Sequence, residues 1–346
     1  MLDCVFYGAT LRSQWDVNQH VCSWVGVMCE PSQPSGEAAY VITKVMLAGQ
    51  GTSSACPSTS GSVDCNVCAK SPNFAGLPST VQVLDLSYRG VVGGLNSDSG
   101  LLFSQLPNIV ELDLQGNSFT APPSFEGLPT TLQRLDLHSN GMSSGSGGIR
   151  FVGLPSSLLT LQLSQNHLSG SVDWAQLPAG LQTLDLSHNS YSGDVSFSTL
   201  PTSLTTLDLS YNSFTTAGGS AGVVSVQTLP HLTYCGLEAN SFSGSFAFTS
   251  LPSQLTYLDL RMNGFSNVIS LASTGVSSTH WLYVMNNPWA CPLPPQTDPA
   301  FALPTEDSYP TYCITSGGIC VGVVIGGDGG VVVVYVVELS HMNTTT

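Results

Sequence analysis

The sequence predicts a solenoid in which every repeated unit adds one strand to a curved, parallel β-sheet and then returns through a mostly irregular segment with short 3-10 or β structure. Its strongest basis is the pattern LxxLxLxxN, clearest in LQTLDLSHN at 181–189, which returns along most of the chain. The repeat length also supports a solenoid, because the turn residue recurs after 23 positions from Asn166 to Asn189 and after 23 more at Asn212. Most strands also follow a Leu-Pro pair, and proline, with its fixed φ and missing N–H donor, ends any preceding helical turn.

Within one unit, alternation along the strand places neighbouring side chains on opposite faces. Leu181, Leu184 and Leu186 are therefore expected to point into the core. Asp185 lies between two of these leucines and is expected on the concave, solvent-exposed face. Asn189 stands at the turn, where its side-chain amide can hydrogen-bond backbone groups that no sheet partner reaches.

The turn position sets the number of strands in the predicted sheet. Nine units share this position, with Asn in all but the first: Arg89, Asn117, Asn140, Asn166, Asn189, Asn212, Asn240, Asn263 and Asn287. A degenerate unit with Ile42, Val45 and Leu47 opens the array. We therefore expect about ten strands, stacked roughly 4.8 Å apart.

The remainder of the chain divides around the repeats by composition. In order, the sequence predicts an N-terminal cap with the first strand at 1–50, a Cys-containing insertion at 51–76, the repeats at 77–290, a Pro-rich C-terminal cap and stalk at 291–318, a transmembrane segment at 319–339 and a tail at 340–346. Caps are expected because they shield the open ends of a solenoid core.

The segment 319–339 has two interpretations. As a helix it is largely apolar and about 21 residues long, enough to cross a bilayer, although Asp328 at its centre would cost roughly 2.5–3.5 kcal/mol. As a Val-rich hairpin it would pair 319–325 with 331–337. We favour the helix, which predicts a single-pass membrane protein at the cell surface, with a secreted protein as the alternative.

The charge balance narrows the class of partner. Seven Lys plus Arg stand against 22 Asp plus Glu, for a net charge of −15. A strongly acidic chain repels the phosphate backbone of nucleic acids. The composition therefore excludes nucleic acid and favours a basic or neutral ligand.

These units resemble the leucine-rich repeat family. Ser-Gly pairs after the turn, such as Ser192-Gly193, are similar to its plant-type repeat subclass. The segment from Trp15 to Cys29 is similar to the N-terminal cap of plant receptor-like protein ectodomains and of kinetoplastid promastigote surface antigens, and NPWAC at 287–291 resembles the start of an extracellular C-terminal cap. The resemblance implies a cell-surface or secreted binding protein with a disulfide-closed cap at each end.

Ten cysteines indicate an oxidising compartment. By the same resemblance, Cys22 with Cys29 would close the N-terminal cap, and Cys291 with Cys313 the C-terminal one. Cysteines 4, 56, 65 and 68 surround the insertion and allow three pairings. The CxxC spacing at 65–68 lacks a second ligand pair, so no metal is predicted.

Cys235 differs from the other cysteines because it occupies an inward position of its unit, equivalent to Leu184. A cysteine at such a position packs as a small apolar side chain. We therefore expect Cys235 to be reduced and buried.

Six aspartates, which we call the acidic ladder, occupy the concave position between the last two leucines of their units: Asp85, Asp113, Asp136, Asp185, Asp208 and Asp259. Like charges at strand spacing repel unless they are hydrogen-bonded or countered. A cationic ligand or calcium would relieve that repulsion. The alternative is that Asp is simply frequent at this position.

An aromatic cluster occupies the concave face near the C-terminal end of the repeats: Tyr234, Tyr257, Trp281 and Tyr283, with Arg261 beside them. Exposed aromatic side chains on a rigid sheet bring contact area at low entropic cost and are typical of binding hot spots. This cluster is the preferred candidate ligand site. The alternative is that Trp281 and Tyr283 pack beneath the C-terminal cap.

Patterns that would indicate an enzyme are weak. Residues 218–222 fit GxSxG, but that motif needs a strand-to-helix elbow with His and acid partners, which a repeat insertion does not supply. We expect a non-enzymatic protein without a cofactor that binds a protein, peptide or glycan ligand through its concave face. A structural surface-coat protein without a specific ligand and a secreted enzyme inhibitor are the alternatives.

Overall fold

The computed structural model describes residues 27–31, 40–46, 79–93, 106–144, 148–248, 251–266, 281–284, 286–288, 312–314, 319–322 and 335–338. The chain divides into two compact units, 1–191 and 192–346. Each unit is described by itself below.

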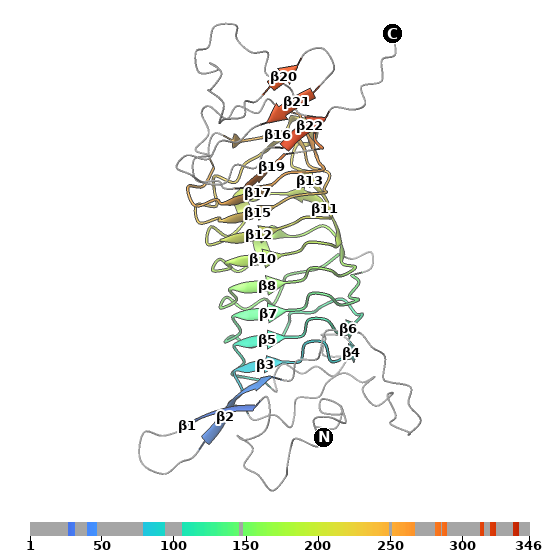
Figure 1. The fold of residues 1–346 in the computed structure, drawn as a ribbon. Helices are drawn as coiled ribbons and strands as arrows, with labels where there is room; N and C mark the ends of the chain where they lie inside the picture. Colours follow the sequence, from blue (N-terminus) through green and yellow to red (C-terminus); the bar gives the residue numbers. More distant parts are fainter. Residues whose placement is uncertain are drawn as a thin grey trace. The chain divides into compact units, whose positions relative to one another are not determined.

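In the first unit, successive repeats contribute the neighbouring strands of one sheet (Figure 1). In chain order these strands are β1 (Val27–Pro31), β2 (Tyr40–Met46), β3 (Val83–Asp85), β5 (Glu111–Asp113), β7 (Arg134–Asp136), β8 (Thr160–Gln162) and β10 (Thr183–Asp185). All pairs from β2 onward are parallel and stay in the register of the repeat, so that Leu112 pairs with Leu135 and Leu161 with Leu184. Val45 pairs with Leu84, as the degenerate first unit predicted, whereas β1 pairs antiparallel with β2.

The second unit continues the same pattern. Its parallel strands are β12 (Thr206–Asp208), β15 (Tyr234–Gly236), β17 (Tyr257–Asp259) and β19 (Trp281–Tyr283). Together with the six from β2 to β10, the described residues contain ten strands of this type. The predicted number and register of the strands are therefore confirmed.

The return side of each repeat is short and irregular, as predicted. It carries the small strands β4 (Val92–Gly93), β6 (Ser118–Phe119), β9 (Ser169–Gly170), β11 (Ser190–Val195), β13 (Ser213–Thr216), β14 (Val223–Val224), β16 (Ser243–Phe246) and β18 (Gly264–Phe265). Among the described residues they are accompanied by the 3-10 turns η6 (Trp174–Gln176), η7 (Phe197–Thr199) and η8 (Gly219–Ala221).

The core consists of aliphatic side chains stacked from one repeat to the next. Leu184 and Leu207, on the strands of their repeats, are fully buried. A second buried column follows two positions after the turn residue and includes Phe214, Phe242 and Phe265. Cys235 takes the leucine position of its strand, where it is buried and free, as predicted. Burial raises the pKa of its thiol, which keeps it protonated and unreactive.

Most turn asparagines connect two repeats, as Asn166 illustrates. The amide of Asn166 donates to the carbonyls of Leu163 at 3.0 Å and Ser164 at 3.1 Å in its own repeat, and to Leu137 at 3.1 Å in the repeat before. Its oxygen accepts from the backbone N–H of Met142 at 3.1 Å. These bonds satisfy buried backbone groups at the point where the strand ends, which is the role that the sequence predicted.

The residue before each turn asparagine has a left-handed backbone. In the described repeats, φ at this position lies near +55°, for example 54° at Gln165 and 53° at His188. Gly116 fills the position in the second full repeat, where a Cβ would lie 2.3 Å from the ring of Tyr88. The backbone angle alone does not require glycine, since other residues adopt it in the neighbouring repeats, but a side chain at Gly116 would have to displace the ring of the exposed Tyr88.

The described parts of 319–339 are strands. β21 (Ile319–Gly322) pairs antiparallel with β20 (Tyr312–Ile314) on one side and with β22 (Tyr335–Glu338) on the other. The extended backbone suits the β-branched valines, and the pairing is that of the hairpin alternative. In the part of the chain that the structure describes, no helix is both long and apolar enough to cross a bilayer.

Other predictions lie outside the described residues. They concern the insertion at 51–76, the remaining residues of the two caps, and Cys22 and Cys291. Cys29 and Cys313 are described only as backbone positions of β1 and β20. The four predicted disulfide cysteines therefore stay predictions.

Candidate functional site

On the sheet face opposite the buried leucines, the side chains of each repeat fall into three columns. The residue that is commonest in each column defines a pattern, and departures from that pattern are the exceptions. On β10 the columns contain Thr183, Asp185 and Ser187, and β12 repeats this Thr-x-Asp-x-Ser pattern. From β3 to β8 the pattern is replaced by the apolar Val83 and by the polar residues Glu111, Gln115, Arg134, His138 and Gln162. In the second unit it is replaced at Tyr234, Gly236, Glu238, Tyr257, Arg261, Trp281 and Tyr283. Departures from a repeated pattern mark positions that the fold itself does not specify, so these two groups are the candidate sites.

The acidic ladder has a structural role in every repeat where it occurs. One oxygen of each aspartate accepts a hydrogen bond from the backbone N–H two residues later, for example 2.9 Å from Asp185 to Ser187 N and 3.0 Å from Asp208 to Ser210 N. The same bond occurs at Asp85, Asp113, Asp136 and Asp259. This is the turn-forming contact that Asp makes with its own backbone. It gives a local reason for Asp at this position and lowers the need for an external cation.

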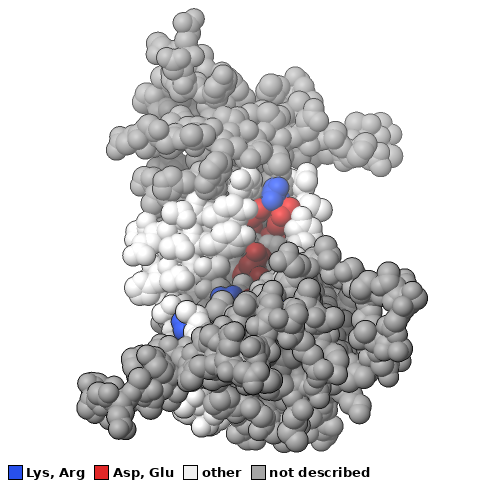
Figure 2. Space-filling view, turned by 60° about the horizontal axis from the view of Figure 1, so that its bottom comes forward, with Lys and Arg blue, Asp and Glu red and all other residues white. Residues whose placement is uncertain are grey.

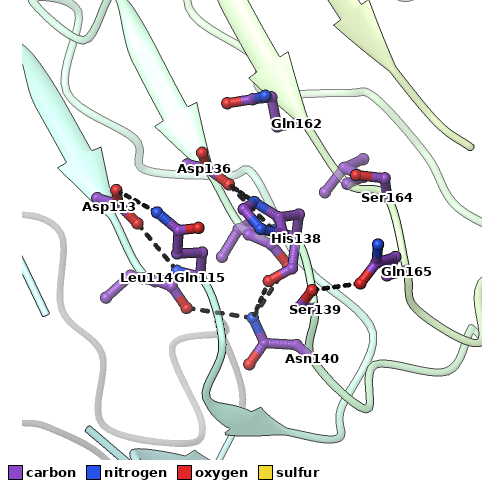
Figure 3. Close-up of polar contacts among 12 residues, drawn as sticks. Asp113, Leu114, Gln115, Asp136, His138, Ser139, Asn140, Gln162, Ser164 and Gln165 are labelled. Atoms are coloured by element: carbon purple, nitrogen blue, oxygen red, sulfur yellow. Dashed lines mark hydrogen bonds and ion pairs between the residues drawn. The ribbon is translucent and has the colours of Figure 1, made fainter. Parts of the chain in front are cut away.

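Three of the exceptional residues of the first unit, Arg134, His138 and Gln162, form a hydrogen-bonded network with Asp136. Figure 3 shows the bond between His138 and Asp136, and beside it the bond between Gln115 and Asp113. Asp136 is 1% exposed and accepts from Arg134 and from the His138 ring, both at 2.8 Å. Arg134 also donates to the side-chain oxygen of Gln162 on the next strand at 2.8 Å. Gln115 donates separately to Asp113 at 2.9 Å. The Asp136 carboxylate is thus paired with Arg134 and His138 within the network.

The pKa values of His138, in this network, and of Asp113, beside it, are both shifted. The pKa of His138 is raised, first by its hydrogen bond to Asp136 and further by the charges of Asp136, Asp113 and Asp185, against the effect of desolvation. The pKa of Asp113 is also raised, mainly by burial and partly by the nearby Asp136 and Asp85. The imidazole therefore gains a proton more readily than a free histidine.

In the second unit the aromatic cluster is a stack of rings that runs across neighbouring strands. The rings of Tyr234 and Tyr257 are parallel, with centroids 4.5 Å apart and planes inclined by 8°. Tyr257 and Tyr283 follow at 5.4 Å with an inclination of 50°. All three side chains are half-buried, so a substantial part of the stack faces solvent. The structure thus brings together three of the aromatic residues that the sequence singled out.

Arg261 is held against this stack by two carboxylates. Its guanidinium lies 4.9 Å from the ring centre of Tyr283 and donates to Asp259 at 2.6 Å and to Glu238 at 2.9 Å. The paired carboxylates fix the plane of the guanidinium over the ring, where a cation–π contact adds to the ion pairs. Arg261 is therefore a preorganised part of the surface.

A glycine organises the other end of the stack. Gly236 replaces the ladder aspartate of its strand, and a Cβ there would lie 2.7 Å from Oδ1 of Asp208 and 2.8 Å from the hydroxyl of Ser210. Without that Cβ, the Asp208 carboxylate leans over the glycine and accepts from the Tyr234 hydroxyl at 3.1 Å. Gly236 therefore allows the contact between Asp208 and the stack.

The aromatic cluster of the second unit lies in a surrounding of net negative charge. Burial and the charge of Asp259 raise the pKa of Tyr257 to about 12 and also raise the pKa of Glu238. The charge of Glu238 in turn raises the pKa of the exposed Tyr211, whose hydroxyl bonds to it. Three carboxylates beside the aromatic cluster, on Asp208, Glu238 and Asp259, outnumber its one guanidinium, on Arg261. In Figure 2, acidic atoms lie beside basic ones, and the other described atoms around them are largely uncharged.

Sequence reasoning singled out the aromatic residues but missed Glu238, Gly236 and Tyr211. Glu238 and Gly236 could have been found, because both depart from the Thr-x-Asp-x-Ser pattern. Trp281 is paired with Tyr257 in the backbone register of β19, but its side chain lies outside the described part of the chain.

Ser220, from the GxSxG match, lies in the 3-10 turn η8 among exposed residues rather than at a strand-to-helix elbow. Within the described residues, no group of three or more His, Cys, Asp or Glu side chains is arranged to hold a metal ion.

Comparisons with known proteins agree with the fold. A family model described as "Leucine Rich repeat" matches residues 201–221, and no curated protein matches the sequence. A crystal structure of a plant ice-binding protein is 19% identical with a TM-score of 0.58, covering 83% of this chain and 84% of that one. The Arabidopsis receptor kinase HAESA, in complex with the peptide hormone IDA and the co-receptor SERK1, is 22% identical with a TM-score of 0.55, covering 82% of this chain.

The second of these proteins is much longer, because the chain spans 47% of the HAESA chain in that structure. Another structure, the HAESA ectodomain with an extended IDA peptide, gives a TM-score of 0.50 at 21% identity. At such identities the likeness concerns the fold alone. The matching repeat at 201–221, the strand register and the small second strand after the turn together show that this chain has the fold of a leucine-rich repeat solenoid.

Proposed function

We propose that this protein acts outside the cell or at its surface and binds a peptide or protein ligand through the aromatic cluster of the second unit. The observation that carries the proposal is the half-buried stack of Tyr234, Tyr257 and Tyr283 with Arg261 held against it. Aromatic and arginine side chains are the residues most enriched in binding hot spots.

The physical basis is preorganisation. Tyr257 lies between two other rings, its hydroxyl donates to Asp259 at 3.3 Å, and Arg261 is fixed by two ion pairs. These side chains lose little further freedom when a ligand binds, so more of the contact energy remains as affinity. A solenoid sheet holds them without requiring a conformational change.

The comparisons support a peptide ligand over the other classes. HAESA, a receptor kinase with a similar fold, is in complex with a peptide hormone and a co-receptor. The same fold in the plant ice-binding protein serves another purpose, so the proposal depends on the side chains of this cluster and not on the fold. Trp281 is included in the proposed surface because its strand pairs with that of Tyr257.

The test begins with selection of peptides from a randomised display library on the immobilised full chain, followed by affinity measurement for variants by calorimetry. We expect Tyr257→Ala to weaken binding of selected peptides by roughly 10-fold or more, as for a central hot-spot residue. Thr183→Ala, at the equivalent column of the first unit, is the matched control and should leave affinity unchanged. Trp281→Ala should also weaken binding.

The outcome decides between recognition and the alternative of a structural coat. Thermal unfolding of each variant shows whether the fold is intact. If no peptide is enriched over a surface without protein, or if Tyr257→Ala binds the selected peptides as tightly as the parent protein, the proposal is wrong.

A further inference from the structure

Two cysteines lie opposite each other in the small sheet formed by β20, β21 and β22 of the second unit (Figure 1). In the antiparallel pair of β20 with β21, Cys313 is the register partner of Cys320. Directly opposite residues of such a pair share a face of the sheet and have Cα atoms roughly 4.5–5.5 Å apart. A disulfide spans Cα separations of roughly 4.4–6.8 Å. The backbone register therefore places the two cysteines at a separation that a disulfide can bridge.

The same register leaves little choice of partner within this sheet. Cys320 lies on the central strand, and its register partner on the other side is Val337 of β22. Among the residues that the structure describes in these three strands, Cys313 and Cys320 are the only cysteines. Each is therefore the one cysteine that the described sheet offers to the other.

The two strands are also close in the chain. Four residues, 315–318, join β20 to β21, and they end in two glycines, which are common in short hairpin loops. Because loop-closure entropy grows with loop length, a link across such a hairpin costs little chain entropy. The sequence resemblance gives Cys313 another partner, Cys291, which is farther away in the chain and lies outside the described residues. One cysteine forms one disulfide, so the two pairings exclude each other.

We propose that Cys313 and Cys320 form a disulfide that links β20 to β21. When the S–S bond forms, the two thiols lose two protons and two electrons. The electron acceptor is the disulfide of a thiol–disulfide oxidoreductase in the secretory compartment, which is itself reduced to two thiols. The bond adds a covalent link to the backbone pairing and so stabilises the strand form of residues 319–322.

This inference goes beyond the proposed function. It needs the oxidising compartment that a protein of the cell surface passes through, but it involves no ligand and no residue of the aromatic cluster. The selection of library peptides does not depend on the bond. Loss of the disulfide would therefore leave the proposed function standing, and failure of peptide binding would leave the disulfide standing.

The test is peptide mapping of the full chain, produced through the secretory pathway of a eukaryotic host. Free thiols are blocked with N-ethylmaleimide in denaturant at mildly acidic pH, where few thiolates are present to exchange disulfides. Chymotrypsin then cleaves after Phe, Tyr and Trp. Cys313 and Cys320 fall together in peptide 313–335, and Cys291 falls in peptide 290–301.

Without reduction, we expect peptide 313–335 to carry no maleimide and to be two hydrogens lighter than after reduction. Cys235, which is free and buried, is the internal control, and its peptide 235–242 should be fully blocked once the protein is denatured. A disulfide joining peptide 313–335 to 290–301, or to any other peptide, would overturn the proposal. Maleimide on both cysteines of peptide 313–335 would overturn it as well.

Cys320→Ser and Cys291→Ser form the matched pair of variants. The proposal requires that Cys320→Ser changes Cys313 from unblocked to fully blocked, and that Cys291→Ser leaves the bridge in peptide 313–335 unchanged. The reverse result would establish the pairing of Cys291 with Cys313 and would overturn the proposal. If either variant fails to fold, the map of the parent protein still decides between the two pairings.

Discussion

At the scale of single residues, the turn asparagine contributes more than its conformational preference. Asn166 is 5% exposed, and its one amide group serves backbone atoms of two repeats. A buried carbonyl or N–H without a partner costs roughly 1–3 kcal/mol. The asparagine is thus both a turn former and a link between neighbouring repeats.

Replacing Asn166 by Ala should therefore lower the free energy of unfolding by at least about 2 kcal/mol, because several buried backbone groups lose their partner at once. Urea unfolding measures the change. Asn108→Ala is the control, since the exposed Asn108 makes a single bond, to the Ser79 carbonyl. A loss at Asn166 no greater than at Asn108 would contradict the proposed link.

His138 predicts a pH dependence of stability. Its pKa in the folded protein is raised by Asp136, so protonation is more favourable in the folded than in the unfolded state. The resulting stabilisation is fully present below the unfolded pKa of about 6.5 and disappears as the pH rises through the higher folded pKa. His138→Ser restores the residue that is commonest at this column and removes the effect.

The measurement is urea unfolding of both proteins at about pH 5.5 and about pH 8.5. The stability of the parent relative to His138→Ser should be greater at the lower pH, by roughly 0.2–1 kcal/mol for a partly exposed pair. The same difference at both pH values would show that the ion pair contributes nothing.

At the scale of an element, the return segments of consecutive repeats make close backbone contacts. Gly127 and Gly153 occupy the same place in the segments FEGLP and FVGLP, with φ of 81° and 90°. A Cβ on Gly127 would meet nothing within 4 Å, whereas one on Gly153 would lie 2.8 Å from the N of Glu126 and from the O of Phe125. The left-handed backbone angle favours glycine at both positions, but only Gly153 is also constrained by the backbone of the neighbouring segment.

Gly153→Ala should consequently destabilise the protein more than Gly127→Ala. Both substitutions force an L-residue into the left-handed region, at roughly 1–2 kcal/mol, and the Gly153 variant adds about 1–3 kcal/mol of steric conflict with backbone that cannot rotate away. Thermal unfolding of the two variants side by side provides the comparison. Equal effects would show that the neighbouring segment can move aside.

At the scale of the whole molecule, each repeat contacts mainly its neighbours. The inward leucines of β8 and β10 pair directly, and so do those of β3 and β5. Each of these pairs joins strands of consecutive repeats. Stability in such an array is close to a sum of repeat and nearest-neighbour contributions. A defect in one repeat should therefore spread only as far as its neighbours.

Leu184→Ala tests this within the first unit. Removing a fully buried leucine side chain should cost about 2–5 kcal/mol. Amide hydrogen exchange should then show loss of protection in β8 and β10, with β3 affected much less. A uniform loss over the unit would indicate that it unfolds as one cooperative body.

Much of the fold was available from the sequence because its signals are local and repeated. The side-chain alternation of a strand placed Leu184 inside and Asp185 outside, and the recurrence of Asn189 and its equivalents set the strand number and register. Cys235 could be identified as a core residue from its place in the pattern alone. None of these required knowledge of a distant contact.

What only the tertiary structure decided concerns contacts between repeats. The turn bond of Asp185 to Ser187 is local, but the link from Tyr234 to Asp208 joins residues 26 apart, and that from Arg261 to Glu238 joins residues 23 apart. Such distances depend on how neighbouring strands are aligned and on which side chain is missing between them, as at Gly236. A pattern shows which face a residue occupies, whereas its partner on that face follows from packing across strands.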